Sequence, residues 1–311
     1  MKTYCWRILL VGAWCGALAL SVHNSIAAEK RDQAAQPVVT AAKPAATPAA
    51  DKYTLRYKFR EGEEIRSKVS NLATIETTIA GNTQTTEMVS ISTKLWRITG
   101  VDAASQITFE HTVEAVDMRN QMSGRQEVRY NSATDKTAPP GYADIAQTIG
   151  KPLTVVTIDP LGAVLKREQR QRTNLDNTGS VLVVPLPKEP IALGHVWTLP
   201  VEVLLPLKDG SHKSIQTRQR YELKKVEGSV ATIAVETQIL TPVSNPEIRA
   251  QLIQRMWQGT MDFDIDSGRM IGQRTDLDER VLGFSGPESS MHYVARVTEE
   301  LLPAVAKTAA K

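Results

Sequence analysis

Three aspartates alternate with apolar residues in one short stretch and have the residue type that binds divalent cations. Asp262, Asp264 and Asp266 are spaced like the first ligands of a calcium-binding loop. Such a loop needs glycine at its sixth position and a carboxylate at its twelfth, where this chain has Ser267 and Gln273. We therefore interpret the aspartates as the solvated side of a strand and predict no metal site and no cofactor. A weak calcium site at this edge is kept as a hypothesis.

A second segment comes close to a hydrolase signature. Gly283–Pro287 reads GFSGP, which resembles the G-x-S-x-G nucleophile elbow. That elbow needs glycine at its fifth position and a sharp turn from a strand into a helix. The fifth residue here is proline and no helical pattern follows, so we interpret the segment as a Gly/Ser/Pro loop.

The remaining polar residues select no catalytic set. The histidines of the predicted mature chain are His111, His195, His212 and His292, and no H-E-x-x-H motif occurs. His111 and His292 would meet only if the first and last regions of the fold pair. No glycine-rich phosphate loop opens a helix, and no spacing of acidic residues selects a hydrolase pair. We predict no catalytic residues, leave ligand-binding residues unassigned, and favour a non-enzymatic role.

The N-terminal residues predict export. Lys2 and Arg7 precede an apolar run at residues 8–22, and small residues follow at 25–27, as in a cleaved signal peptide. The alternative is a membrane anchor, but the run is shorter than the ~20 residues that a spanning helix needs. We expect cleavage after residue 27, no membrane span in the mature chain, and a periplasmic or secreted location.

Cysteine content and charge exclude several classes of protein. Cys5 and Cys15 are the only cysteines and lie inside the predicted signal. The mature chain would therefore have no disulfide, no cysteine metal site and no cysteine nucleophile. The net charge of the full chain is +3, and loss of Lys2 and Arg7 lowers it further. A charge this close to balance gives no support for a nucleic-acid partner.

Alternating apolar and polar residues predict a mainly β fold around two similar units. Gly259–Asp278 predicts a strand, a tight turn at Ser267-Gly268 and a second strand. Gly150–Arg167 predicts a similar unit with its turn at Asp159–Gly162. Each unit follows a short segment of helical character, so both mark the later part of a longer repeat.

The two halves of the chain share one predicted order of elements. The first half predicts strands at 53–59, 65–79, 88–98 and from 107, hairpins at Gly81-Asn82 and around 122–124, and a short helix at 142–149. The second half predicts strands at 196–206, 215–226 and 230–239, a two-residue hairpin at Asp209-Gly210, and a helix at 246–258. Duplication explains this agreement, although any β protein can show hairpins at such spacing. A final strand over 291–297 closes the fold and is a candidate partner of the first.

We therefore predict two tandem antiparallel curved-sheet repeats of half-barrel character, each with a short helix before its last hairpin. The sheets would pack face to face or continue into each other. Residues 166–172 would form an exposed linker helix or loop, and no aromatics accompany its basic residues as a nucleic-acid site would require. The predicted divisions are a signal peptide (1–27), a disordered Ala/Pro linker (28–51), repeat 1 (52–167), an inter-repeat linker (168–189), repeat 2 (190–302) and a flexible tail (303–311).

Four segments carry a family resemblance: YTLRYKFREGEEIR, GKPLTVVTIDPLGAVL, YELKKVEGSVATIAVET and GTMDFDIDSGRMIGQ. They resemble an uncharacterised family of exported bacterial duplicated β proteins, a domain of unknown function, over most of residues 53–300. The predicted architecture is also loosely similar to the half-barrels of envelope lipoprotein carriers, which shelter acyl chains. Neither resemblance implies an activity or a functional residue.

The expectation for function is an exported, non-enzymatic β protein of the cell envelope that binds an apolar or lipid-like ligand between curved sheets. The alternative is an extracytoplasmic scaffold whose exposed strand edges bind an envelope protein. A third reading is a hydrolase whose catalytic set assembles only in the fold. A large apolar cavity would favour the first reading, and a free apolar edge strand would favour the second.

Overall fold

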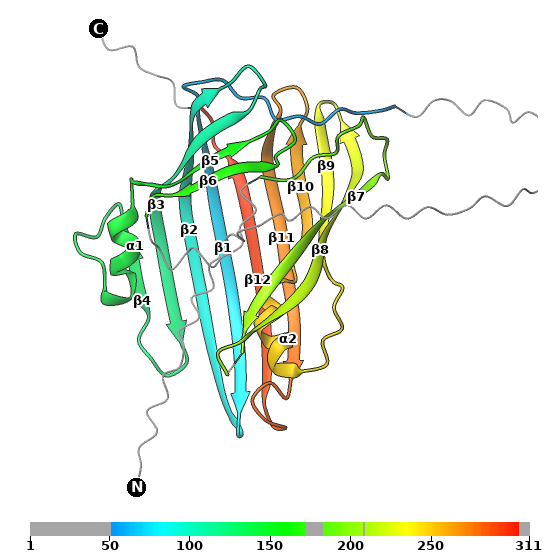
Figure 1. The fold of residues 1–311 in the computed structure, drawn as a ribbon. Helices are drawn as coiled ribbons and strands as arrows, with labels where there is room; N and C mark the ends of the chain where they lie inside the picture. The colour runs from blue at the N-terminus through cyan, green and yellow to red at the C-terminus, as the bar shows by residue number, and fades with distance from the viewer. Residues whose placement is uncertain (1–50, 172–182, 208, 305–311) are drawn as a thin grey trace, which may run out of the picture.

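The computed structural model describes residues 51–171, 183–207 and 209–304 (Figure 1). The predicted signal peptide lies outside the described residues, as do residues 28–50 of the Ala/Pro linker, 172–182 of the inter-repeat linker and 305–311 of the tail. Among the described residues, the helices are too short and too polar to span a membrane.

Within the described part of the chain, twelve strands form one antiparallel sheet. The strands of the first half are β1 (Glu64–Ile79), β2 (Asn82–Val101), β3 (Ile107–Met122), β4 (Val128–Asn131), β5 (Pro152–Ile158) and β6 (Val164–Gln169). Those of the second half are β7 (Val196–Pro206), β8 (His212–Glu227), β9 (Val230–Ile239), β10 (Gln258–Asp264), β11 (Arg269–Leu282) and β12 (Ser290–Leu301). The helical elements are η1 (Pro140–Tyr142), α1 (Ala143–Thr148), α2 (Pro246–Leu252) and η3 (Ile253–Arg255).

Within each half of the chain the strands follow one another as a meander. At the centre of the sheet, the first strand of the first half pairs with the last strand of the second half. The strand order of the sheet is β6-β5-β3-β2-β1-β12-β11-β10-β9-β8-β7, and β4 pairs beside β3. The last strand, β12, pairs with β1, with Ala73 opposite Ala295, and not with residues 53–59, the first strand that the sequence predicts. This topology leaves β6 and β7 as the edge strands.

The mainly β prediction is confirmed. Two arrangements were expected for the strands of the two halves, packing face to face or continuing into each other, and in the structure they continue into each other as one large open sheet. Each half is a run of strands with a helix between β3 and β5 or between β9 and β10. Such a meander also arises whenever consecutive hairpins pair, so the common order does not by itself establish duplication.

Residues 53–59, which we call the strap, were predicted to form the first strand but do not join the sheet. Leu55, Tyr57 and Phe59 are buried, as the alternating pattern indicated. The strap is extended but is not a strand of the sheet, because its backbone hydrogen bonds go to separate segments. The donors and acceptors pair as Tyr53 with Ile191, Tyr57 N–H with the Pro160 carbonyl, and Lys58 N–H with the Gly268 carbonyl.

Three further predictions were wrong in detail. The segment expected to be a linker helix or loop contributes Lys166–Gln169 to β6, and its almost complete exposure explains why no apolar alternation marks it. The first hairpin turns at Ala80-Gly81, one residue early, since both residues have the positive φ that such a turn requires. The expected two-residue turn at Asp209-Gly210 is longer, because Leu207 N–H bonds to the Ser211 carbonyl.

The second helix, α2, is shorter than the predicted helix at 246–258. Asn245 caps α2 by accepting a hydrogen bond from the Glu247 N–H, and Pro246 occupies the first turn. Ile248, Leu252 and Ile253 are buried. The α-helix ends at Leu252, and η3 continues only to Arg255, because β10 begins at Gln258.

The sheet curls so that both halves contribute to one main core. Phe109 of β3 and Ile158 of β5 belong to the same buried cluster as Tyr221 of β8 and Phe263 of β10. Figure 1 shows β7 and β8 crossing in front of the neighbouring strands of the second half. We call the side of the sheet that carries these residues the inner face. Smaller clusters on this face pack beneath α1 and beneath α2 with η3.

Candidate functional site

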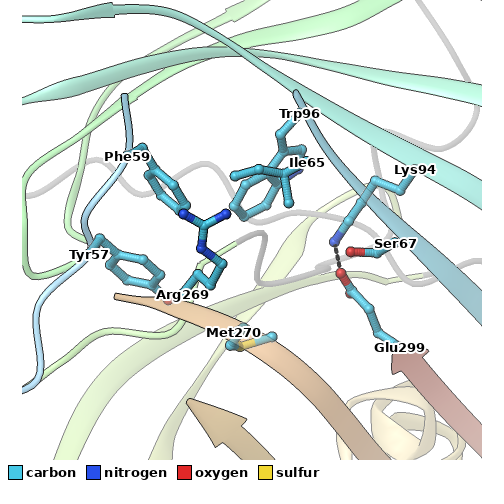
Figure 2. A pocket seen from close by; sticks show the side chains of 9 residues that line it. All are labelled: Tyr57, Phe59, Ile65, Ser67, Lys94, Trp96, Arg269, Met270 and Glu299. Carbon is cyan, nitrogen blue, oxygen red and sulfur yellow. Dashed lines mark ion pairs between the residues drawn. The ribbon is translucent and has the colours of Figure 1, made fainter. Parts of the chain in front are cut away.

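A small hollow lies on the inner face beside the main core (Figure 2). It holds a volume of about 20 Å³, enough for roughly one water molecule. Its walls come from the strap, β1, β2, β11 and β12. They are formed by Tyr57, Phe59, Ile65, Ser67, Lys94, Trp96, Arg269, Met270 and Glu299. We call this site the aromatic hollow.

One wall of the aromatic hollow is a largely buried ion pair. Lys94 of β2 pairs with Glu299 of β12, and their side chains are only 14% and 13% exposed. The Lys94 ammonium also lies 4.9 Å from the centre of the Trp96 ring, a cation–π contact. Gln273 Nε2 donates to the Glu299 carboxylate at 3.4 Å. The pair is therefore fixed by three strands and an aromatic ring.

The second cation of the hollow is compensated in the same way. Arg269 at the start of β11 lies 5.7 Å from the centre of the Phe59 ring. Its Nη1 is 2.7 Å from the carboxylate of Glu63. Both cations of the hollow therefore already have carboxylate partners.

Aromatic rings build the apolar wall. Trp96 stacks on Phe109 with ring centres 4.4 Å apart, and Phe59 meets Trp96 edge-on at 6.4 Å. The Tyr57 hydroxyl accepts a hydrogen bond from the Val184 N–H at 3.0 Å, and burial raises the pKa of Tyr57. The indole Nε1 of Trp96 is buried without a hydrogen-bond partner. An unpaired buried donor costs about 1–3 kcal/mol, so Trp96 retains an unused hydrogen-bonding group.

Two polar rows cross the inner face next to the hollow. Strand register places one row across β2, β1, β12 and β11 as Ser92, Val69, Glu299 and Gln273. The adjacent row consists of Ser90, Asn71, Val297 and Thr275. The next row is apolar again: Met88, Ala73, Ala295 and Leu277. The inner face is therefore amphipathic along its length, with the two polar rows separating apolar clusters.

The geometry does not support a serine–lysine hydrolase in the hollow. Ser67 lies opposite Lys94 in the β1–β2 ladder. The Lys94 ammonium is already engaged in its ion pair with Glu299 and in its contact with the Trp96 ring. The ion pair thus holds the lysine in a structural role.

The predicted histidine and loop positions do not assemble a catalytic set. His111 of β3 and His292 of β12 are separated by β2 and β1, so they do not meet. Desolvation, reinforced by the charges of Lys94 and Arg167, lowers the pKa of His111 to about 3. His292 Nε2 lies 2.7 Å from Asp278. The GFSGP segment is a loop between two strands, as interpreted, and has no elbow geometry.

The alternating aspartates organise a turn. Asp262 accepts a hydrogen bond from the Thr232 hydroxyl at 2.7 Å. Asp264 accepts from the Ser267 N–H at 2.9 Å, and that bond is the main cause that lowers the pKa of Asp264. Within residues 51–171, 183–207 and 209–304, no group of three or more His, Cys, Asp or Glu side chains is placed to hold a metal ion.

Sequence reasoning missed the residues of the aromatic hollow. A usable signal existed, because Lys94 occupies an inward position of a strand that also points Trp96 inward. A charged residue on the inward-facing side of an amphipathic strand indicates that a partner of opposite charge is buried beside it. The partner could not be named, since Glu299 lies on the last strand of the sheet.

Comparisons with known proteins give only distant likenesses. No family profile and no curated protein matches the chain. The chain is similar to a structure of lipid–protein interactions in lipovitellin, with 11% identity and a TM-score of 0.44, covering 81% of this chain and 27% of that one. It therefore spans about a quarter of that protein.

Two other solved structures are also similar. One is DynF from the dynemicin biosynthesis pathway of Micromonospora chersina, with 9% identity, a TM-score of 0.21, and coverage of 86% of this chain and 92% of that one. The other is Pseudomonas aeruginosa OpdQ, with 8% identity, a TM-score of 0.22, and coverage of 78% and 100%. Likenesses at this level support no inference about function.

Proposed function

We propose that the protein is an exported, non-enzymatic binding protein whose inner face receives an amphipathic, lipid-like ligand. The observation that carries this proposal is the junction between the main core and the polar rows. Aromatic and aliphatic side chains suit an apolar tail, and the adjacent serines and the Lys94–Glu299 pair suit a polar head.

The size of the hollow sets a condition on this function. Ligand pockets for drug-sized molecules hold roughly 300–1,000 Å³, whereas the aromatic hollow holds about 20 Å³. A ligand enters only where part of the protein that now fills the inner face moves aside.

Mass spectrometry of the native protein tests the proposal. The protein is purified from the envelope fraction of cells that make it, extracted with organic solvent, and compared with an equally treated sample of an unrelated envelope protein. We expect one class of amphipathic molecule enriched at close to one per chain. Absence of any enriched molecule, together with failure to bind a fluorescent fatty acid, would contradict it.

Export has its own test. We propose cleavage of the signal after residue 27, which places the mature N-terminus at Ala28. N-terminal sequencing of the protein from an envelope or culture-medium fraction measures this directly. Recovery in the cytoplasm with Met1 intact would contradict the assignment.

A second candidate function is an extracytoplasmic scaffold, and the edge strand β7 favours it. Only Glu202 is charged in Val196–Pro206, and Leu204 is 60% exposed. The opposite edge strand β6 carries Lys166, Arg167 and Glu168, which discourage pairing. Leu204→Lys should abolish capture of an envelope protein by β7 if this reading holds. Unchanged capture by that variant would exclude β7 as the contact.

We also propose that the two halves arose by duplication. The support is the equivalent position of α1 and α2, each between the third and fourth strands of its half when β4 is set aside. Sequences of relatives test this proposal. Alignment of residues 52–167 with 190–302 across them should yield matching positions at the hairpin turns, and an absence of such matches would count against duplication.

A further inference from the structure

We propose that the strap, residues 53–59, is an internal occupant of the ligand site and that an extended apolar ligand displaces it. This inference rests on the proposed function and identifies the part of the protein that must move. Leu55, Tyr57 and Phe59 are 0%, 4% and 8% exposed, and all three belong to the main core. Their spacing of two residues is how an extended chain presents side chains to a groove. The inner face therefore already accommodates one extended apolar segment.

The strap is attached to the sheet more weakly than its burial suggests. Two of its backbone hydrogen bonds join Tyr53 to Ile191, one runs from Tyr57 N–H to the Pro160 carbonyl, and one runs from Lys58 N–H to the Gly268 carbonyl. In contrast, every residue of β1 has a partner opposite it in β2. Burial of apolar surface contributes about 25 cal/mol per Å². An apolar ligand in the same groove would bury similar surface and so replace the contribution that the strap makes. Exchange of the strap for a ligand therefore needs few backbone hydrogen bonds to break.

Some side-chain contacts must also release. Arg56 donates to the Pro187 carbonyl at 2.8 Å, and the Tyr57 hydroxyl pairs with the backbone of Val184. Lys58 Nζ donates to the Ile265 carbonyl at 2.9 Å. These contacts are to loops outside the strands, so their loss leaves the sheet intact.

Two equivalent hairpin turns form the seat of the strap. The turn between β5 and β6 supplies Pro160, and the turn between β10 and β11 supplies Gly268. A Cβ on Gly162 would lie 2.8 Å from Tyr57 Cε2, and a Cβ on Gly268 would lie 2.6 Å from the Arg56 carbonyl oxygen. Glycine at both turns is what lets the strap lie this close. The turns of the two similar sequence units, Gly150–Arg167 and Gly259–Asp278, therefore both contact the strap.

An exposed turn connects the strap to β1. Gly62 has a φ of +78° with open space around it, and Glu61 is exposed. The turn is closed by a hydrogen bond from Glu63 N–H to the Arg60 carbonyl at 3.1 Å. The Gly62 N–H donates to the Ile98 carbonyl of β2 at 2.9 Å, so rotation on the strap side of Gly62, at Glu61, would swing the strap away while β1 keeps its register.

A pair of glycine variants tests the strap. Gly268→Ala places a Cβ whose three nearest atoms all belong to Arg56 and Lys58 of the strap, whereas Gly228→Ala changes a turn of similar φ, +60°, that has open space. The second variant therefore controls for turn strain alone. Amide hydrogen exchange at Tyr57 and Lys58, and fluorescence titration with cis-parinaric acid, are measured on both variants and on the native sequence.

We expect Gly268→Ala to speed exchange at Tyr57 and Lys58 at least about tenfold and to tighten probe binding severalfold, while Gly228→Ala changes neither. Exchange at these amides equal to that of the β1 amides in every sample would overturn the strap inference whatever the probe does. Faster strap exchange without probe binding in any sample would uphold strap release but contradict the proposed ligand class. Probe binding that is equal in all three proteins, despite faster exchange, would show that the ligand does not compete with the strap.

Discussion

Two different kinds of segment cover the inner face, the helix α2 and the strap. Their difference indicates which part of the face can exchange its cover for a ligand. Over the smaller clusters of the second half, α2 lies on the sheet with its own backbone hydrogen bonds and an Asn245 cap. Over the main core, the strap has no helix or strand of its own and relies on buried side chains. A helix retains its hydrogen bonds wherever it sits, but the strap depends on the surface beneath it. The main core is therefore where a competitor can replace part of the fold.

The largest expected effect compares a sheet residue of the main core with a strap residue. Phe263→Ala removes a fully buried ring from β10 and should lower the unfolding free energy by about 3–5 kcal/mol. Leu55→Ala should lower it by less, because a detached strap leaves the sheet folded. Chemical denaturation measures both. Equal losses would show that the strap unfolds only with the sheet and would break the comparison.

Removal of one partner of the Lys94–Glu299 ion pair should lower the stability of the protein strongly. Glu299→Leu leaves the Lys94 ammonium without its carboxylate, and loss of one partner of a buried pair costs about 3–5 kcal/mol. Because both side chains keep some exposure to solvent, we expect the unfolding free energy to fall by about 3 kcal/mol. The double variant Lys94→Met/Glu299→Leu should recover most of it. A double variant as unstable as the single one would indicate that packing, and not charge, is what was lost.

Acid should weaken the side of the sheet that carries His111. Its pKa falls from 6.5 to about 3 on folding, so the unfolded chain binds a proton more readily than the folded chain. The stability from neutral His111 is therefore complete above pH 6.5 and is lost progressively as the pH falls toward 3. His111→Gln should flatten the pH dependence of unfolding in this window. An unchanged slope in that variant would assign the acid sensitivity to other groups.

The smallest effect concerns the helix cap. Asn245→Ala removes the side-chain acceptor for the Glu247 N–H and should cost about 1 kcal/mol. Because α2 covers a different cluster, hydrogen exchange in the strap should not change. Faster strap exchange in this variant would mean that the two coverings are coupled.

Strand positions could be predicted where one side of a strand is buried. Val196–Pro206 and Val230–Ile239 match the structure at both ends, because inward apolar residues alternate with exposed ones. β6 gave no such signal, since an edge strand exposed on both sides needs no apolar residues. The pattern of the strap predicted which side chains are buried, but alternation does not specify which backbone groups pair.

The aromatic hollow could not be predicted because it depends on register over long distances in the sequence. Lys94 meets Glu299 only because β1 pairs with both β2 and β12. Residue spacing within either segment carries no information about that pairing. The turns around Pro160 and Gly268 were recognised as similar, whereas their shared contact with the strap emerges only from the fold.

A reversible lock on the strap tests the central claim most directly. Tyr53 and Ile191 exchange two backbone hydrogen bonds, so their Cα atoms have the spacing of about 5.5 Å that suits a disulfide. The double variant Tyr53→Cys/Ile191→Cys is titrated with cis-parinaric acid before and after reduction, in the chain that starts at Ala28. The account predicts binding that is at least about tenfold weaker in the oxidised form and returns to the native value on reduction. Equal binding in the two forms would contradict it.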